Sequence, residues 1–217
     1  MSLLSTKFGE KKFSDFTEDQ LRLFKKLNTP RKIQDFLETL EANFEFRKVN
    51  SSPKLVLENK KAHCFEGALL AAAILRFHGH KPLLVDLKTT VEDDYHVIAV
   101  FKENGHWGAI SKTNHAILRY RDPVYRNIRE LVMSFFNEYF FDNGKKTLRS
   151  YSRPINLSRF DKFGWMTSEK SLEFIAKSFD NIPHVPILNK KMIYGLRKAD
   201  PLEIKIFELV QWQEKEK

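Results

Sequence analysis

The residue best suited to chemistry is Cys64, the single cysteine of the 217-residue chain. It precedes an apolar run at residues 68–75 that contains only Ala, Leu and Ile, and Gly79 follows shortly after. This pattern predicts a helix from about Cys64 to His78 that is buried on nearly every face. In the first turn of a helix, unpaired N–H groups and the positive end of the dipole favour the reactive thiolate. The pattern therefore offers a nucleophile; the alternative is a small buried apolar residue.

A candidate general base for this thiol lies on one of the strands expected after the helix. We expect strands at residues 82–88, 94–101 and 105–111, since these runs are apolar or rich in β-branched and aromatic residues. His96 lies at the start of the second strand. A cysteine on a helix and a histidine on a following strand are often brought together in space, so Cys64 and His96 form the candidate catalytic pair.

Other polar and aromatic residues near these elements could contact a substrate. Glu66 is unusual in so apolar a helix, and a structural role in capping or ion pairing is favoured over a catalytic one. Trp107 could contact a substrate, and His115, which flanks its strand, could line a cleft. Arg119 and Tyr120 belong to a polar, aromatic and basic segment, which forms either a substrate-facing rim or a surface loop with an edge strand.

The order of these features resembles the transglutaminase-like superfamily. The matching residues are Cys64 at a helix start, His96 in the run His-Val-Ile-Ala-Val, and Trp107 in the run Gly-His-Trp-Gly-Ala-Ile. The resemblance covers roughly residues 30–125. It implies a papain-like cysteine catalytic core, in which a central buried helix packs on an antiparallel sheet. It also implies that Cys64 is the nucleophile, that His96 is the base, and that a peptide or an amide is the substrate.

The third member of that family's catalytic triad, an Asp, is replaced in this sequence. Its position falls near Ser111, four residues after Trp107. A serine can orient an imidazole by a neutral hydrogen bond, but it cannot stabilise imidazolium as a carboxylate does. Asn114 offers an amide, which papain-like proteases use, and Asp122 offers a carboxylate a little further on. All three residues are candidates to orient His96.

The rest of the chain predicts a helical frame around this centre. Thr17 is an expected N-cap with Gln20 completing a capping box, and Thr29 is an expected N-cap followed by Pro30. In chain order we expect a helix at 17–27, a helix from Pro30, an irregular connection at 44–59, a helix at 127–141, a strand at 147–157, a helix at 168–178, a linker-like run at 182–187 and a helix at 200–213. The fold class is therefore expected to be α+β. One domain should span residues 1–217, with a core at 30–160 and a helical extension at 161–217.

Composition and charge argue against several classes of function. The formal net charge is +9, but basic and acidic residues alternate and no nucleic-acid-binding motif appears, so a solvated basic surface is favoured over nucleic-acid binding. No apolar window is long enough for a membrane span. One cysteine excludes an intrachain disulfide, and no apolar leader is present, which together predict a cytoplasmic protein. No metal-ligand spacing is recognisable, so neither a metal nor a cofactor is expected.

These residues together predict a cysteine-dependent acyl-transfer enzyme. We expect it to hydrolyse an amide or peptide bond through Cys64 and His96, with transfer to an amine in place of water as the related possibility. The alternative is a catalytically impaired module that has lost the Asp and keeps the cleft to bind a peptide or protein.

Overall fold

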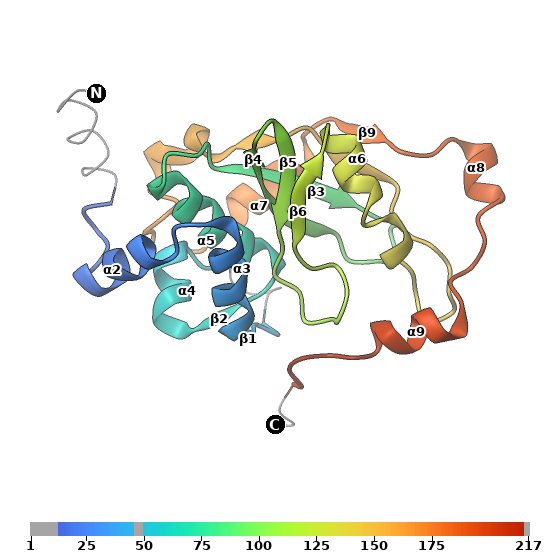
Figure 1. Cartoon of the computed structure of the whole chain (residues 1–217), viewed down its shortest axis with the longest axis horizontal. Helices are drawn as coiled ribbons and strands as arrows, with labels where there is room; N and C mark the ends of the chain where they lie inside the picture. The colour runs from blue at the N-terminus through green and yellow to red at the C-terminus, as the bar shows by residue number, and fades with distance from the viewer. Residues whose placement is uncertain (1–12, 46–49, 215–217) are drawn as a thin grey trace.

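The structure is a computed structural model that describes residues 13–45 and 50–214 (Figure 1). It combines helices with an antiparallel sheet, so the expected α+β class is confirmed. Helices α2 to α5 gather at one end of the sheet, while α8 and α9 lie at the other end (Figure 1). Residues 46–49 of the connection expected at 44–59 lie outside the described residues.

The described elements follow in chain order. They are α2 (Glu18–Lys26), α3 (Pro30–Thr39), β1 (Glu41–Ala42), α4 (Pro53–Asn59), β2 (Lys61–Ala62), α5 (Cys64–Phe77), β3 (Leu83–Lys88), β4 (His96–Glu103), β5 (His106–Ile110), β6 (Arg121–Tyr125), α6 (Ile128–Met133), η1 (Phe136–Glu138), β7 (Ser150–Ser152), β8 (Ile155–Asn156), η2 (Leu157–Phe163), α7 (Glu173–Asp180), β9 (His184–Pro186), α8 (Lys190–Tyr194) and α9 (Pro201–Phe207).

Helix α5 is the buried centre of the fold. Residues 68–75 expose at most 1% of their surface, because the helix is apolar all round and must be enclosed on every side. Helices α3 and α4 and strand β4 pack against it. The helix ends at Phe77 with His78 as its C-cap, and Gly79 follows with a φ of +87°, close to the predicted stop. Cys64 is therefore the first residue of a rigid, enclosed helix.

The main sheet has seven strands and is antiparallel throughout. The strand order is β6-β5-β4-β3-β7-β9, and β8 also pairs with β3. Strands β3, β4 and β5 form close to the positions expected from the sequence. His96 is the first residue of β4, which lies between β3 and β5 in the middle of the sheet.

The two faces of the sheet bury two separate apolar clusters. Successive residues of a strand point to opposite faces. Val97 packs in the cluster around α5, whereas Ile98 packs in a second cluster with Leu131 and Phe135 from the region of α6. The cavity described below is lined by residues of both clusters, Phe65 from the cluster around α5 and Leu118 and Tyr139 from the second.

The two helices nearest the N-terminus begin at the predicted cap residues. Thr17 caps α2, and Gln20 completes the capping box. Thr29 caps α3, and Pro30 is its first residue. Helix α3 buries its apolar side against α5, and this places Gln34 of α3 in the interior.

Two segments form helices other than those expected. The connection at 44–59 contains α4, with Ser52 as its N-cap and a proline at its first position. The helix expected at 127–141 ends at Met133 and is followed by the short η1. Four aromatic residues in this segment are buried, Phe135, Phe136, Tyr139 and Phe140. All four would also lie on one face of a continuous helix, so the apolar pattern does not reveal that α6 ends at Met133.

The segment expected as a C-terminal extension divides into two parts. Trp165 and Phe179 belong to the α5 cluster, and the expected linker run forms β9, which pairs with β7. By contrast, α8 and α9 bury no residue. The last helix ends at Phe207 and not near residue 213, because the chain beyond it pairs with another segment. No helix among the described residues is long and apolar enough to cross a membrane.

Candidate active site

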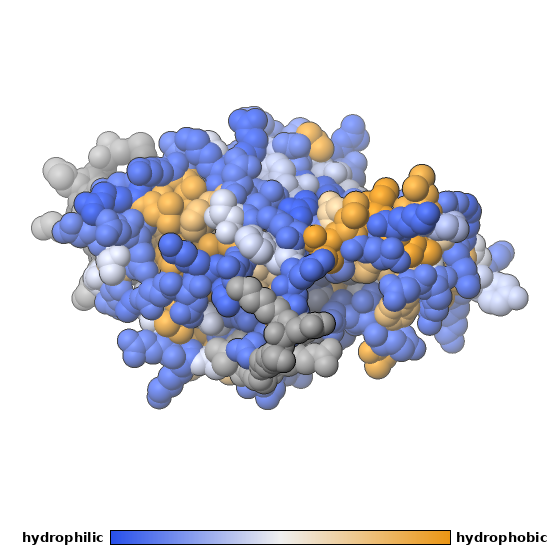
Figure 2. Space-filling model, turned by 90° about the horizontal axis from the view of Figure 1, so that it is seen from below, coloured by the Kyte–Doolittle hydropathy of each residue, from blue (hydrophilic) through white to orange (hydrophobic). Residues whose placement is uncertain are grey.

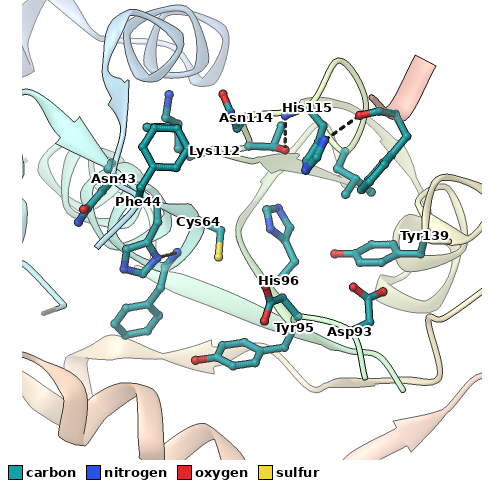
Figure 3. Close-up of a pocket in the computed structure, with 18 of the residues that line it drawn as sticks. Asn43, Phe44, Cys64, Asp93, Tyr95, His96, Lys112, Asn114, His115 and Tyr139 are labelled. Carbon is teal, nitrogen blue, oxygen red and sulfur yellow. Dashed lines mark hydrogen bonds between the residues drawn. The ribbon is translucent and has the colours of Figure 1, made fainter. Parts of the chain in front are cut away.

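Cys64 and His96 line one cavity of about 390 Å³. In Figure 3 the sulfur of Cys64 and the ring of His96 point into this shared space. The backbone N–H of Val97 donates to the Cys64 sulfur, so the thiol lies against the residue that follows His96. The first residue of the buried helix and the first residue of a central strand thus line the same cavity.

The sulfur and the imidazole are neighbours without a direct hydrogen bond in the described part of the chain. The sulfur instead accepts the backbone N–H groups of Val97 and Phe65. In an unliganded active site the catalytic hydrogen bonds are often long and tighten only when substrate binds. The arrangement is compatible with proton transfer from Cys64 to His96 during attack on a substrate.

His96 is oriented by Ser111. The His96 Nε2 and the Ser111 Oγ are 2.7 Å apart, and the same hydroxyl lies 2.5 Å from the carbonyl oxygen of Leu118. A carbonyl can only accept, so the single hydroxyl proton of Ser111 goes to Leu118 and the hydroxyl accepts from His96 Nε2–H. The neutral imidazole therefore carries its proton on Nε2, which leaves Nδ1 as the basic nitrogen. Of the three candidates for this position, Ser111 alone makes the contact.

Ser111 is itself fixed by Gln34, a residue that sequence reasoning missed. The Gln34 side-chain amide accepts the Ser111 N–H at 2.9 Å and donates to the Ser111 carbonyl at 2.9 Å. Only 4% of Gln34 is exposed. A polar residue on the apolar face of α3, between Ile33 and Leu37, was the available signal. That signal indicates a buried polar contact but does not name the partner.

Leu118 presents its carbonyl to Ser111 from an unusual backbone conformation. Its φ is +63°, in the left-handed region that a leucine rarely adopts. The N–H of Leu118 donates to Glu138 Oε2 at 2.7 Å, and Glu138 pairs with Arg121 at 2.6 Å. A strained backbone conformation of this kind persists only where surrounding contacts hold it in place. Glu138 and Arg121 thus support the last contact in the series from His96 through Ser111.

Burial sets the protonation states of Cys64 and His96. Loss of water raises the pKa of the Cys64 thiol from 9.0 to about 11, an effect larger than that of its two N–H donors. Burial likewise lowers the pKa of His96 from 6.5 to about 4, and the nearby His115 and His63 lower it further. At neutral pH the thiol and the imidazole are both uncharged. The thiolate expected from the helix N-terminus is therefore not the resting form, because desolvation outweighs the helix dipole.

Aromatic side chains form much of the cavity wall. They are Phe44, Phe65, Tyr95, Tyr139, Phe140 and Phe207. Figure 3 shows Tyr139 with its hydroxyl directed toward His96. Tyr139 is 5% exposed, and no hydrogen-bond partner for its hydroxyl exists among the described residues. A buried hydroxyl without a partner is costly, so this group is available to a bound molecule.

A buried lysine closes another part of the cavity. Lys112 exposes 2% of its surface, and its Nζ donates to the carbonyl of Leu40 at 2.6 Å. Burial lowers the pKa of its ammonium from 10.5 to about 8. The stem of Lys112 packs on the first turn of α5 at Gly67, where a side chain would collide with it.

Glu66 has a structural role at the start of α5. It is fully buried, and its carboxylate accepts from Asn43 Nδ2 at 2.9 Å, the Ser51 N–H at 2.7 Å and the His63 N–H at 3.1 Å. Glu66 is not one of the residues that line the cavity. Its hydrogen bonds tie the two preceding loop segments to the helix that carries Cys64.

Asn114, His115 and Arg119 contact the C-terminal segment. The Asn114 amide pairs with the backbone of Trp212, so it does not orient His96 as considered above. His115 lines the cavity and stacks on Phe207. Arg119 forms an ion pair of 3.2 Å with Glu38 and is not among the lining residues. Of these three predicted residues, Asn114 and His115 face the space beside Cys64.

The remaining predicted residues lie away from the cavity. Trp107 packs with the second apolar cluster, on the opposite face of the sheet from α5. Tyr120 stacks on Phe101 with ring centroids 6.0 Å apart, and burial raises its pKa to about 12. Tyr120 and Asp122 line a separate hollow and are not among the residues that line the cavity at Cys64, and the contact to His96 is made by Ser111 instead of Asp122.

Comparisons with known proteins identify no relative of this chain. No protein-family model matches the chain, and no curated protein matches it significantly. Among the described residues, no group of three or more His, Cys, Asp or Glu side chains is placed to hold a metal ion. The functional argument therefore rests on the site itself.

Proposed function

We propose that the protein is a cysteine-dependent acyl-transfer enzyme with a papain-like core of the transglutaminase-like type. The observation that carries the proposal is the series of contacts from His96 through Ser111 to the Leu118 carbonyl, built beside the only thiol of the chain. A base whose tautomer is set by a third group, next to a nucleophile, is the arrangement of a catalytic triad. The aromatic cavity around it suits a peptide or another amide.

The proposed reaction proceeds in two halves. The Cys64 sulfur attacks the carbonyl carbon of the substrate while its proton passes to Nδ1 of His96. The C–N bond then breaks, and His96 returns that proton to the leaving amine, which leaves a thioester on Cys64. Water, or an amine, attacks the thioester with His96 as base, and the acyl group departs as an acid or a new amide.

Developing charge in this reaction needs donors inside the cavity. The backbone N–H of Cys64 lies in the first turn of α5, where a helix leaves N–H groups unpaired. The Tyr139 hydroxyl is a second donor that faces the same space. Ser111 supplies no charge, so the imidazolium formed in the first step is stabilised less than it would be by a carboxylate.

One observation also favours a second function, the binding of a peptide without its cleavage. The pKa values of about 11 for Cys64 and about 4 for His96 describe a pair that is uncharged at rest. A cavity of this kind would also serve a module that binds peptides without cleaving them.

An acylation experiment separates the two functions. The protein is incubated with p-nitrophenyl acetate, and its intact mass and the release of nitrophenol are followed. An enzyme should gain one acetyl group on Cys64, and the gain should be absent in Cys64→Ser and much slower in His96→Ala. Acetylation of wild type at the same rate as His96→Ala would reject the enzyme and leave the binding module.

A further inference from the structure

The chain beyond α9 pairs with the loop at residues 114–116 through one isolated antiparallel bridge. The N–H of Ala116 donates to the carbonyl of Leu209 at 3.0 Å, and the N–H of Gln211 donates to the carbonyl of Asn114 at 2.8 Å. An antiparallel bridge lies between these two hydrogen bonds. The loop at 114–116 therefore acts as a strand edge, and the C-terminal segment is paired with it.

Hydrogen bonds from side chains to main-chain groups add to this pairing. The Asn114 amide accepts the Trp212 N–H at 2.9 Å and donates to the Trp212 carbonyl at 2.9 Å. The Gln211 side chain donates to the carbonyl of Glu38 at 2.8 Å. Contacts to main-chain groups do not depend on the identity of the bound side chains, so a different extended peptide could make the same contacts to Asn114.

One side chain of the segment enters the cavity. Phe207 lines the same space as Cys64 and stacks on His115, with ring centroids 4.0 Å apart and an interplanar angle of 13°. Its ring centroid is 5.5 Å from that of Phe140. The carbonyl of Phe207 accepts from Nδ1 of His115 at 2.8 Å. The position occupied by Phe207 is thus a subsite that already accepts an aromatic side chain.

The rest of the segment is held weakly. Helices α8 and α9 bury no residue, and Leu202 and Leu209 expose 67% and 62% of their surfaces. Figure 2 shows apolar side chains gathered on the side of the molecule where α9 lies in Figure 1. Segments with few buried contacts open at low free-energy cost. The C-terminal segment can therefore leave its position without unfolding the α5 cluster.

We propose that residues 114–116 and the Phe207 subsite form a binding site for an extended peptide with an aromatic residue. Residues 207–212 occupy this site as an internal ligand, and an incoming peptide takes their place. The inference deepens the proposed function, because it names the substrate class, and as a statement about binding it holds even if Cys64 performs no catalysis.

Calorimetry with a synthetic peptide of residues 204–214 tests the proposal in the full chain. In Phe207→Ala the internal ligand loses its anchor, so the peptide should bind at least about tenfold more tightly than it binds wild type. Leu202→Ala is the matched control, since Leu202 lies on the same helix but not in the cavity, and it should behave as wild type. A peptide that carries alanine in place of its phenylalanine should bind Phe207→Ala at least about tenfold more weakly.

Amide hydrogen exchange provides the second readout. The N–H groups of Ala116 and Gln211 should exchange faster in Phe207→Ala than in Leu202→Ala, because their hydrogen bonds join the two segments. Equal exchange in the two variants, or equal peptide affinity for both, would overturn the proposal. Both measurements are repeated in Cys64→Ser, so a failure of binding is distinguished from a failure of catalysis.

Discussion

The hydrogen bond between His96 and Ser111 decides what the imidazole can do. It places the ring proton on Nε2, so Nδ1 is the nitrogen that can receive the thiol proton. The pKa of Cys64 is about 11 and that of His96 is about 4, so a separated ion pair between them is unfavourable before substrate arrives. In the proposed reaction, proton transfer would therefore accompany the formation of the bond between sulfur and the substrate carbon.

The first prediction concerns the reactivity of Cys64 toward iodoacetamide. The rate should rise about tenfold per pH unit from pH 7 to pH 10, because the thiolate fraction grows that way below a pKa of about 11. His96→Ala should show the same slope, since the imidazole is neutral over this range. Glutathione, measured in parallel, calibrates the reagent. A rate that levels off below pH 8 would instead show a stabilised thiolate.

The second prediction concerns Ser111. In Ser111→Ala the His96 Nε2–H loses its acceptor in a buried site, which costs about 1–3 kcal/mol. If this cost appears in the transition state, acetylation of Cys64 should slow by about 10–100-fold, as measured under single-turnover conditions. Ser168→Ala, in an exposed loop, is the control. An unchanged rate in Ser111→Ala would mean that Ser111 does not orient the base.

Part of this site could be predicted from the sequence. Cys64 and His96 were proposed from a helix start and a following strand, and Ser111 was one of three candidates that the family resemblance suggested. Gln34 could not be assigned, because its partner lies 77 residues away and is brought to it by the packing of α3 against β5, which ends just before Ser111. The choice of Ser111 over Asn114 needed the path of the backbone, since a side chain's direction beyond the end of a strand is not encoded in spacing.

Among the elements, α5 and the segment around Lys112 are fitted most closely to each other. Gly67 leaves room on the helix for the stem of Lys112, and Glu66 anchors two loop segments at the same turn. Cys64 is thus supported from several sides by packing that involves no catalytic group.

The third prediction follows from that packing. Gly67→Ala should destabilise the protein by about 1–3 kcal/mol, because the new Cβ would collide with Lys112, although alanine favours a helix by about 1 kcal/mol. The free energy of urea unfolding measures the change. Gly195→Ala is the matched control, since a Cβ there would approach no atom closer than 3.7 Å. A more stable Gly67→Ala variant would contradict the close fit.

Elements differ in how far the sequence predicts them. Helices α2, α3 and α5 carry cap residues and a clear apolar pattern, and their positions were predicted well. The pattern of Phe135, Phe136, Tyr139 and Phe140 is compatible with one face of a long helix, so it does not report that α6 ends at Met133. The end of α9 depends on pairing with a loop about ninety residues earlier, which local pattern does not report.

For the whole molecule, the buried His96 couples the stability of the fold to pH. The pKa of His96 is about 4 in the folded chain and 6.5 is its ordinary value, so the unfolded chain binds the proton more readily. The stability that this neutral histidine contributes is complete above pH 6.5 and is lost as the pH falls toward 4.

The fourth prediction measures this effect. Between pH 7 and pH 4 the wild-type free energy of unfolding should fall by roughly 3 kcal/mol more than that of His96→Gln, which has no group to titrate at this position. Urea unfolding at the two pH values gives both numbers. Parallel losses in the two proteins would show that His96 is not buried in its neutral form.

Cys64 is the only thiol in the sequence, and it faces the cavity that Phe207 enters. A trifluoromethyl group attached to this sulfur would therefore give a single fluorine resonance, with no competing site to remove. Because aromatic rings surround the label, ring currents would shift its frequency whenever Phe207 leaves or a ligand arrives. The chain thus carries a built-in spectroscopic probe of its own cavity.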